Sequence, residues 1–218
     1  MSKTTIPTGG ITADAIDATK IADDAISEEH IDATVITAST ALAAEPADTD
    51  EFLISDAGTI KRIDYSLIKV ANTPAFHVEL SGAQTIGDAT TTKVQFNTEV
   101  YDTNNNYDNS SNYRFTPQTA GKYFCYLAIK GGVDGVSRLS QFSIEIRKNG
   151  AQIAGSGSDF RSDAYGLGSF GTCTVGVSLN GSSDYLEAFC YINDQSGANT
   201  QIYGGKASVF GAYKLIGA

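Results

Sequence analysis

The apolar positions of the first forty residues recur at a fixed interval of five. The repeat consists of Ile6, Ile11, Ile16, Ile21, Ile26, Ile31 and Ile36. A period of five fits neither the 3.6 residues per turn of an α-helix nor the two-residue alternation of a strand, so a lone element would have no continuous apolar face. Two interpretations remain open. The segment is either a disordered acidic tail with a fortuitous spacing, or an intertwined stalk in which three chains stack their isoleucines in layers. For the stalk we expect short helical turns and extended segments.

Strand-like patterns begin after this segment. Residues 51–55 and 59–63 favour two strands joined by a turn, which predicts a β-hairpin, and residues 64–70 favour either a helical turn or a short strand. Further candidate strands cover residues 75–80, 93–101, 113–115, 121–130, 139–148, 151–154, 171–179, 185–192, 201–203 and 207–215. Asn149-Gly150 is typical of a tight hairpin turn. Short strands between polar turns predict an all-β fold, an antiparallel sandwich or jelly roll.

Charge and aromatic content divide the chain at the same place. The 218 residues carry a net charge of −10, and residues 1–50 contribute −8 of it, with two basic and ten acidic side chains. The first aromatic residue is Phe52. A segment without aromatic rings rarely builds its own core. We therefore predict three parts: a stalk or attachment arm (residues 1–45), a connector with the hairpin (residues 46–73) and a knob (residues 74–218).

The acidic balance also narrows the classes of partner. Phosphate backbones and anionic membrane surfaces both require clustered Lys and Arg, so we expect no nucleic-acid partner. No apolar run approaches the roughly 20 residues that a membrane-spanning helix needs, and the first residues lack the apolar core of a secretory signal. We expect no membrane insertion and production of the chain in a reducing cytoplasm.

The residues capable of catalysis or metal binding form no recognisable pattern. Cys125, Cys173 and Cys190 lack metal-ligand spacing and are expected to be buried free thiols. Neither histidine belongs to an arguable triad, and no carboxylate pair stands out. The oxygen-rich stretch 102–108 lacks the Gly and Glu of a calcium-binding loop, so a polar turn is expected there. The sequence predicts no catalytic residue, no metal and no cofactor, and a protein that is not an enzyme.

The knob sequence resembles the signature of the C1q/tumour-necrosis-factor-like jelly roll. The matching positions are Phe96, Asp102, Tyr107, Phe115, Gly121 and Tyr123. The sequence departs from the pattern at Cys125, where the family has Phe, at Leu127, where it has an aromatic residue, and by one extra residue before Phe115. The resemblance implies a C1q-like antiparallel jelly-roll sandwich that assembles as a homotrimer. The knob core is expected to contain Phe96, Phe115, Tyr123, Cys125 and Phe210.

The connector resembles segments that join shaft and receptor-facing module in bacteriophage tail-fibre and appendage proteins. This resemblance rests on residues 50–63, with the sequence DEFLISDAGTIKRI. It implies a homotrimeric structural protein of the virion, anchored to other virion proteins through residues 1–45, whose knob recognises a host-surface glycan or protein. Two alternatives remain: a capsid or tail decoration or connector protein without a receptor role, and a glycan-degrading tailspike.

The polar loops of the knob are the candidate receptor contacts. Loops rich in Asn, Ser, Gly, Asp and Tyr suit adaptable hydrogen bonding, although they also suit ordinary turns. The candidate contact residues are Asn105, Tyr107, Asn109, Asp159, Arg161, Tyr165, Asp194 and Asn199.

Overall fold

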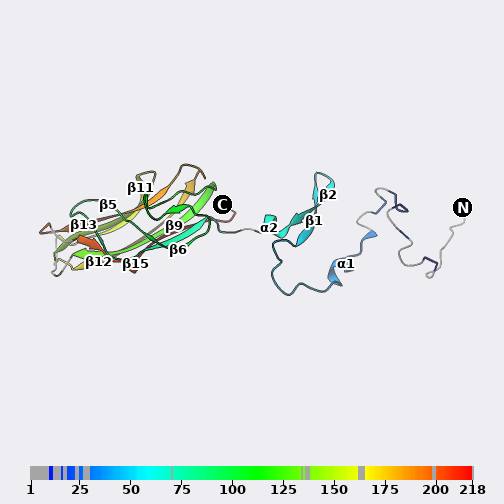
Figure 1. Ribbon diagram of the computed structural model, residues 1–218, viewed down its shortest axis with the longest axis horizontal. Coiled ribbons are helices and arrows are strands. Elements are labelled where there is room, and N and C mark those ends of the chain that lie inside the picture. The colour runs from blue at the N-terminus through cyan, green and yellow to red at the C-terminus, as the bar shows by residue number, and fades with distance from the viewer. Residues whose placement is uncertain are drawn as a thin grey trace. The chain divides into compact units, whose positions relative to one another are not determined.

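The computed structural model divides into two units, residues 1–69 and residues 70–218 (Figure 1). It describes residues 10–11, 16, 19–22, 25–26, 30–69, 71–133, 135, 138–161, 165–197 and 200–217. The predicted knob begins at Pro74, whereas the second unit begins directly after Lys69. Ile6 and Asn199 lie outside the described residues.

The first unit contains the predicted hairpin. Strands β1 (Glu51–Asp56) and β2 (Thr59–Asp64) pair antiparallel, with Asp56 opposite Thr59. The two turn residues, Ala57 and Gly58, both have positive φ (49° and 85°), which is the conformation that a two-residue hairpin turn requires. The segment after the hairpin forms one helical turn, α2 (Tyr65–Ile68), so the helical alternative for residues 64–70 holds.

The repeat region of the first unit leaves its isoleucines exposed. It contains one short helix, α1 (Thr34–Thr37), at whose start the Thr34 N–H donates to Asp32 Oδ1 (2.8 Å). The six isoleucines of the repeat that the structure describes are between 39% and 80% exposed, namely Ile11, Ile16, Ile21, Ile26, Ile31 and Ile36. A single chain therefore leaves these side chains in water.

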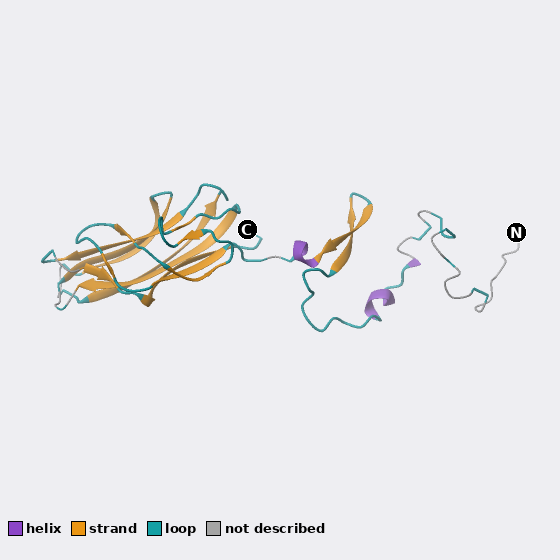
Figure 2. Ribbon diagram, viewed as in Figure 1, coloured by secondary structure: helices purple, strands orange, loops and turns teal. Residues whose placement is uncertain are grey.

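The second unit is a sandwich of two antiparallel sheets (Figure 2). Sheet 1 contains β11 (Ala151–Asp159), β10 (Leu139–Lys148), β13 (Leu186–Asp194), β8 (Arg114–Phe115) and β7 (Tyr107–Asp108), with β5 (Thr92–Lys93) beside β13. Sheet 2 contains β12 (Gly168–Leu179), β9 (Gly121–Val133), β15 (Gly205–Lys214), β3 (Ala75–Leu80) and β6 (Thr98–Asp102), with β14 (Thr200–Ile202) and β4 (Gln84–Thr85) continuing along β9.

The order of pairing identifies a jelly roll. Among β3, β8, β9, β10, β11, β12, β13 and β15, the first strand pairs with the last (β3 with β15) and the second with the seventh (β8 with β13). The third pairs with the sixth (β9 with β12) and the fourth with the fifth (β10 with β11). Nested pairing of this kind defines the double Greek key of jelly rolls. The predicted all-β jelly-roll fold is therefore confirmed.

Alternation along each strand separates core from surface. In β9, Tyr123, Cys125, Leu127 and Ile129 are buried, while the residues between them face away from the core. Aromatic rings pack between the sheets: Phe76 stacks on Phe115 with centroids 4.4 Å apart, and Phe210 meets Phe76 edge-on at 5.1 Å. The five expected core residues are all buried, namely Phe96, Phe115, Tyr123, Cys125 and Phe210.

One predicted strand is divided in the structure. Residues 93–101 were expected to form a single strand, but β5 pairs in sheet 1 and β6 pairs in sheet 2. The chain crosses between the sheets in residues 94–97. Val94 and Phe96 are fully buried along this crossing, which explains their alternation without a continuous strand.

The two ends of the sandwich are distinct. Ala75, Gly121, Lys148 and Leu186 lie at one end, where the Lys214 N–H donates to Pro74 O (3.1 Å); we call this the linker end. Leu139 and Asp194 pair at the opposite end, the far end. β13 runs between them over eight residue steps, about 26 Å.

Candidate functional site

Sheet 2 presents aromatic rings on the face turned away from the core. We define the aromatic face as His77, Tyr101, Phe124, Tyr126 and Tyr213. His77 stacks between Tyr101 (centroids 5.9 Å apart) and Tyr126 (5.8 Å), and Phe124 lies 5.6 Å from Tyr213. These residues come from the neighbouring strands β3, β6, β9 and β15. Their side chains share one face of the sheet because directly paired residues on neighbouring strands point to the same side.

A glycine of β15 occupies the centre of the aromatic face. Gly211 of β15 lies between His77 and Tyr126 in the register of the sheet. A Cβ at Gly211 would stand 2.2 Å from Tyr126 Oη and 2.8 Å from Phe76 O. The ring of Tyr126 therefore lies directly across β15, where its hydroxyl and His77 Nδ1 form a hydrogen bond of 2.7 Å.

The surroundings of Tyr126 favour the neutral form of its phenol. Burial, followed by the hydrogen bond with Tyr101, raises the pKa of Tyr126 above its ordinary value. Glu79 Oε1 lies 3.9 Å from His77 Nε2 on the same side of β3. The cluster thus combines ring surface with a small hydrogen-bonded centre, a composition common in protein–protein interfaces.

The candidate receptor contacts fall into two groups at opposite ends of the knob. Asn105 and Asn109 lie at the linker end, in loops flanking β7. Asp108 organises this region by accepting hydrogen bonds from the N–H groups of Ser110 (3.1 Å), Ser111 (2.9 Å) and Asn112 (3.0 Å). These backbone donors lower the pKa of Asp108 far below its usual range. Within the oxygen-rich stretch 102–108, Asp102 accepts hydrogen bonds from the N–H groups of Asn104 (3.3 Å) and Tyr107 (2.7 Å), so a polar turn lies there, as the sequence predicts.

Tyr107 differs from its expected position in a surface loop. It is only 6% exposed, its ring stacks on Phe76 (5.0 Å), and its hydroxyl donates to Phe96 O (3.2 Å). The expectation was wrong because the turn around Asn105 directs β7 back over the core, so the ring fills the sandwich instead of facing solvent.

The second group lies at the far end. Arg161 donates to Asp159 through Nε (2.9 and 3.0 Å) and Nη2, and this pairing lowers the pKa of Asp159 to about 2. Gln195 Nε2 donates to Tyr165 Oη (2.6 Å). Asp159, Arg161 and Tyr165 therefore lie at the far end of the second unit.

Asp194 is at this end but is not a surface residue. Its side chain is fully buried, and Arg138 Nε lies 3.2 Å from Asp194 Oδ1. The carboxylate also accepts from the Ser196 N–H (3.1 Å). The prediction of a receptor contact was wrong for Asp194, because its buried carboxylate accepts a hydrogen bond from the backbone of the turn that follows β13.

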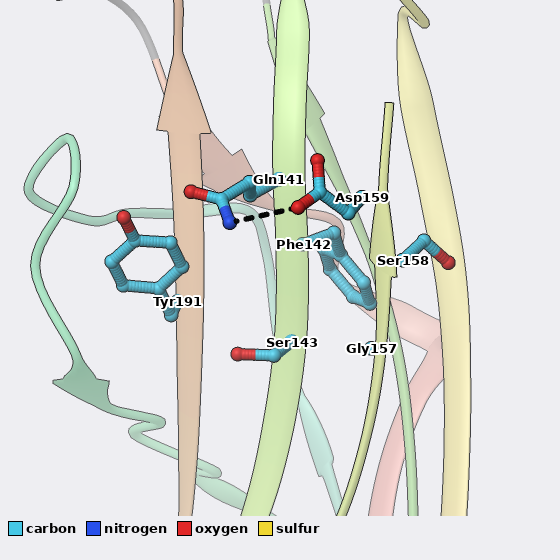
Figure 3. A pocket seen from close by; sticks show the side chains of 7 residues that line it. All are labelled: Gln141, Phe142, Ser143, Gly157, Ser158, Asp159 and Tyr191. Atoms are coloured by element: carbon cyan, nitrogen blue, oxygen red, sulfur yellow. Dashed lines mark hydrogen bonds between the residues drawn. The ribbon is translucent and has the colours of Figure 1, made fainter. Parts of the chain in front are cut away.

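A hollow on sheet 1 was not foreseen. It measures about 280 Å³ and lies on the solvent side of β10, β11 and β13, lined by Gln141, Phe142, Ser143, Gly157, Ser158, Asp159 and Tyr191 (Figure 3). Sequence reasoning places Gln141 and Ser143 on the polar side of a strand, opposite Phe142 and Ile144. It does not reveal that Tyr191 and Asp159, from two other strands, lie beside them.

The cysteines are structural. Cys125 and Cys190 are buried, Cys173 is half-buried, and all three are free thiols. Burial raises the pKa of Cys190 to about 12 and that of Cys173 to about 11. Across the described ranges, no group of three or more His, Cys, Asp or Glu side chains is arranged to hold a metal ion, and no helix is long and apolar enough to cross a membrane.

Comparisons with known proteins give neighbours at the level of the fold only. No family model and no curated protein matches the chain. Among solved structures it is similar to Eiger TNF from S. frugiperda (13% identity, 66% of this chain and 93% of that chain, TM-score 0.48). It is also similar to murine APRIL (13% identity, 65% of this chain and 98% of that chain, TM-score 0.47). The jelly-roll assignment itself rests on the nested strand pairing described above.

Proposed function

We propose that the chain is a homotrimeric fibre protein of a bacteriophage virion that binds a host-surface glycan or protein through its knob. The observation that carries this proposal is the exposure of the repeat isoleucines. Six β-branched apolar side chains at a constant spacing are at least 39% exposed in one chain. Burying each fully is worth roughly 1.5–3 kcal/mol, so the chain has a strong reason to acquire partners along this arm.

An assembly of three chains is the arrangement that best buries the isoleucines of the arm. A common axis lets each layer hold one isoleucine from each chain, while Asp, Glu and Thr between the layers face water. The charge of −8 over residues 1–50 keeps single chains soluble until they meet and suits a basic socket on other virion proteins.

The aromatic face of the knob supports the same symmetry. Its rings lie on the outside of sheet 2, where a lone knob leaves Tyr101 45% exposed. Aromatic side chains are enriched at protein interfaces. Packing of this face against two other knobs would bury the rings and align the three copies on the axis of the stalk.

We expect the far end of the knob to meet the host surface. It lies about 26 Å along β13 from the linker end, where the chain arrives from the connector. Within the second unit, Asp159, Arg161 and Tyr165 gather there. The proposed mechanism is non-covalent binding, with three copies of a weak site combining by avidity. The assignment to a phage rests on the connector resemblance and the repeat arm.

Blocking of particle adsorption by antibody fragments tests the proposed receptor-binding function. Antibody fragments raised against surface loops at the far end should block adsorption of the particle to its host, while fragments against residues 1–45 should bind only dissociated protein. Particles that adsorb normally when saturated with far-end fragments would favour the decoration or connector role. Release of reducing sugar from host polysaccharide by purified protein would instead establish a glycan-degrading enzyme.

A further inference from the structure

The hollow on sheet 1 has a composition that the strand register imposes. Gly157, Ser143 and Tyr191 are directly paired across β11, β10 and β13, and Asp159, Gln141 and Asn193 form the neighbouring row. Both rows face solvent. The first row therefore supplies a floor of two small residues beside one ring, and the second supplies a carboxylate and two carboxamides.

On the β11 side of this floor, Gly157 has no room for a side chain. A Cβ at Gly157 would stand 3.0 Å from both Ser143 Cβ and Phe142 O, closer than ordinary contacts. Figure 3 shows Tyr191 on one side of the hollow and Asp159 on the other, with Gln141 and Ser143 between them. Figure 3 shows the Tyr191 ring face-on, so a flat ligand that extends from Ser143 over Tyr191 would lay one face on that ring.

The polar row offers alternating acceptors and donors. Gln141 Nε2 donates to Asp159 Oδ2 (3.3 Å), and Asn193 Nδ2 donates to Gln141 Oε1 (3.4 Å). Both hydrogen bonds are long, so hydroxyl groups of a ligand can replace them at little cost. Asp159, held ionised by Arg161, is a fixed acceptor, and each carboxamide presents a donor and an acceptor.

We propose that this hollow binds a single hexopyranose unit of a glycan, with the C–H face of the sugar against Tyr191 and adjacent hydroxyls on Gln141, Asn193 and Asp159. This inference rests on the proposed function, since it names the ligand class of the receptor-facing knob. A hollow of about 280 Å³ lies just below the 300–1,000 Å³ typical of sites for drug-sized ligands, which suits one ring.

Other ligand classes fit less well. β10 pairs with β11 on one side and β13 on the other, so an extended peptide could add only at the outer edge of β11, beside the hollow and not over it. The Asp159 carboxylate disfavours an anion, and its pairing with Arg161 disfavours a cation. Hydroxyl groups, which both donate and accept, satisfy the row without bringing charge.

The test measures sugar binding by the purified full-length protein. Ligand-observed saturation-transfer NMR at millimolar concentrations uses the methyl glycosides of glucose, galactose, mannose and N-acetylglucosamine. We expect at least one to bind with an affinity in the millimolar range, as befits one small site. Tyr191→Ala should weaken that binding about tenfold or more, and Tyr191→Phe should preserve it, because the ring face and not the hydroxyl carries the contact.

Two further variants separate the site from folding. Ser143→Leu should abolish binding by filling the floor without changing the melting temperature by more than a few degrees. Tyr203→Ala, which removes a ring that lies against Lys130 on the other sheet, should bind like the parent protein. The inference is overturned if none of the four sugars binds, or if Tyr191→Ala and Ser143→Leu bind as the parent does. Either result, together with neutralisation by far-end antibody fragments, would leave the proposed function standing and reject only the sugar site.

Discussion

Gly211→Ala is the sharpest test of the aromatic face, because one methyl group meets both a ring and a backbone atom. The added Cβ would lie 2.2 Å from Tyr126 Oη, 2.3 Å from Tyr126 Cζ and 2.8 Å from Phe76 O. Tyr126 can rotate away, but the carbonyl of Phe76 belongs to the paired strand β3 and cannot. Overpacking of this kind costs about 1–3 kcal/mol, and loss of the His77–Tyr126 hydrogen bond adds about 1 kcal/mol. We therefore expect a loss of about 2–4 kcal/mol in the free energy of unfolding.

Gly176→Ala is the matched control. Gly176 lies on the same side of sheet 2, in β12, and a Cβ there would have no atom within 4 Å. Because glycine within a strand is less favourable than alanine, this variant should be neutral or more stable by up to about 1 kcal/mol. Urea unfolding of both variants at one chain concentration measures the difference. Equal stability of Gly211→Ala and Gly176→Ala would refute the packing of Tyr126 across β15.

Three further predictions address other parts of the chain. Cys125 and Cys190 should resist iodoacetamide at pH 8 and react fully in guanidinium chloride, because burial raises their thiol pKa values; rapid labelling of the native protein would contradict this. Arg161→Ala should raise the pKa of Asp159 from about 2 toward its ordinary 3.8, as measured by carboxyl-carbon NMR titration. Because this carboxylate has a lowered pKa in the folded state, its contribution to stability is present above about pH 4 and lost as the pH falls toward 2; an unchanged titration midpoint in the variant would show that the ion pair is absent. Ile26→Asp should shift the chain toward monomer in sedimentation equilibrium, since a carboxylate would enter the proposed isoleucine layer, and an undiminished oligomer would exclude that layer.

Much of the fold follows from local pattern. The alternation of Phe142, Ile144 and Ile146 locates β10 correctly, and Asn149-Gly150 forms the turn to β11, with φ of 50° and 81°. These signals are local because a strand buries every second residue and a two-residue turn requires positive φ. The crossing at residues 94–97 shows the limit, since burial alternates there without strand pairing.

The candidate sites were less predictable because they depend on pairing between distant strands. Gln141, Asp159 and Tyr191 come from three strands, and only the register of sheet 1 brings them together. The predictions that Tyr107 and Asp194 are receptor contacts were wrong for a related reason. Tyr107 follows a polar, turn-like stretch and Asp194 begins one, and only the path of the backbone decides that their side chains turn inward.

The mass of the protein in solution tests the central claim most directly. Size-exclusion chromatography with multi-angle light scattering at micromolar concentration should give the mass of three copies of the 22.9 kDa chain, about 69 kDa. The same measurement on Ile26→Asp separates the contribution of the arm from that of the knob. A mass of 22.9 kDa for the parent protein would contradict the account, because the exposed isoleucines and the aromatic face would then have no second copy to cover them.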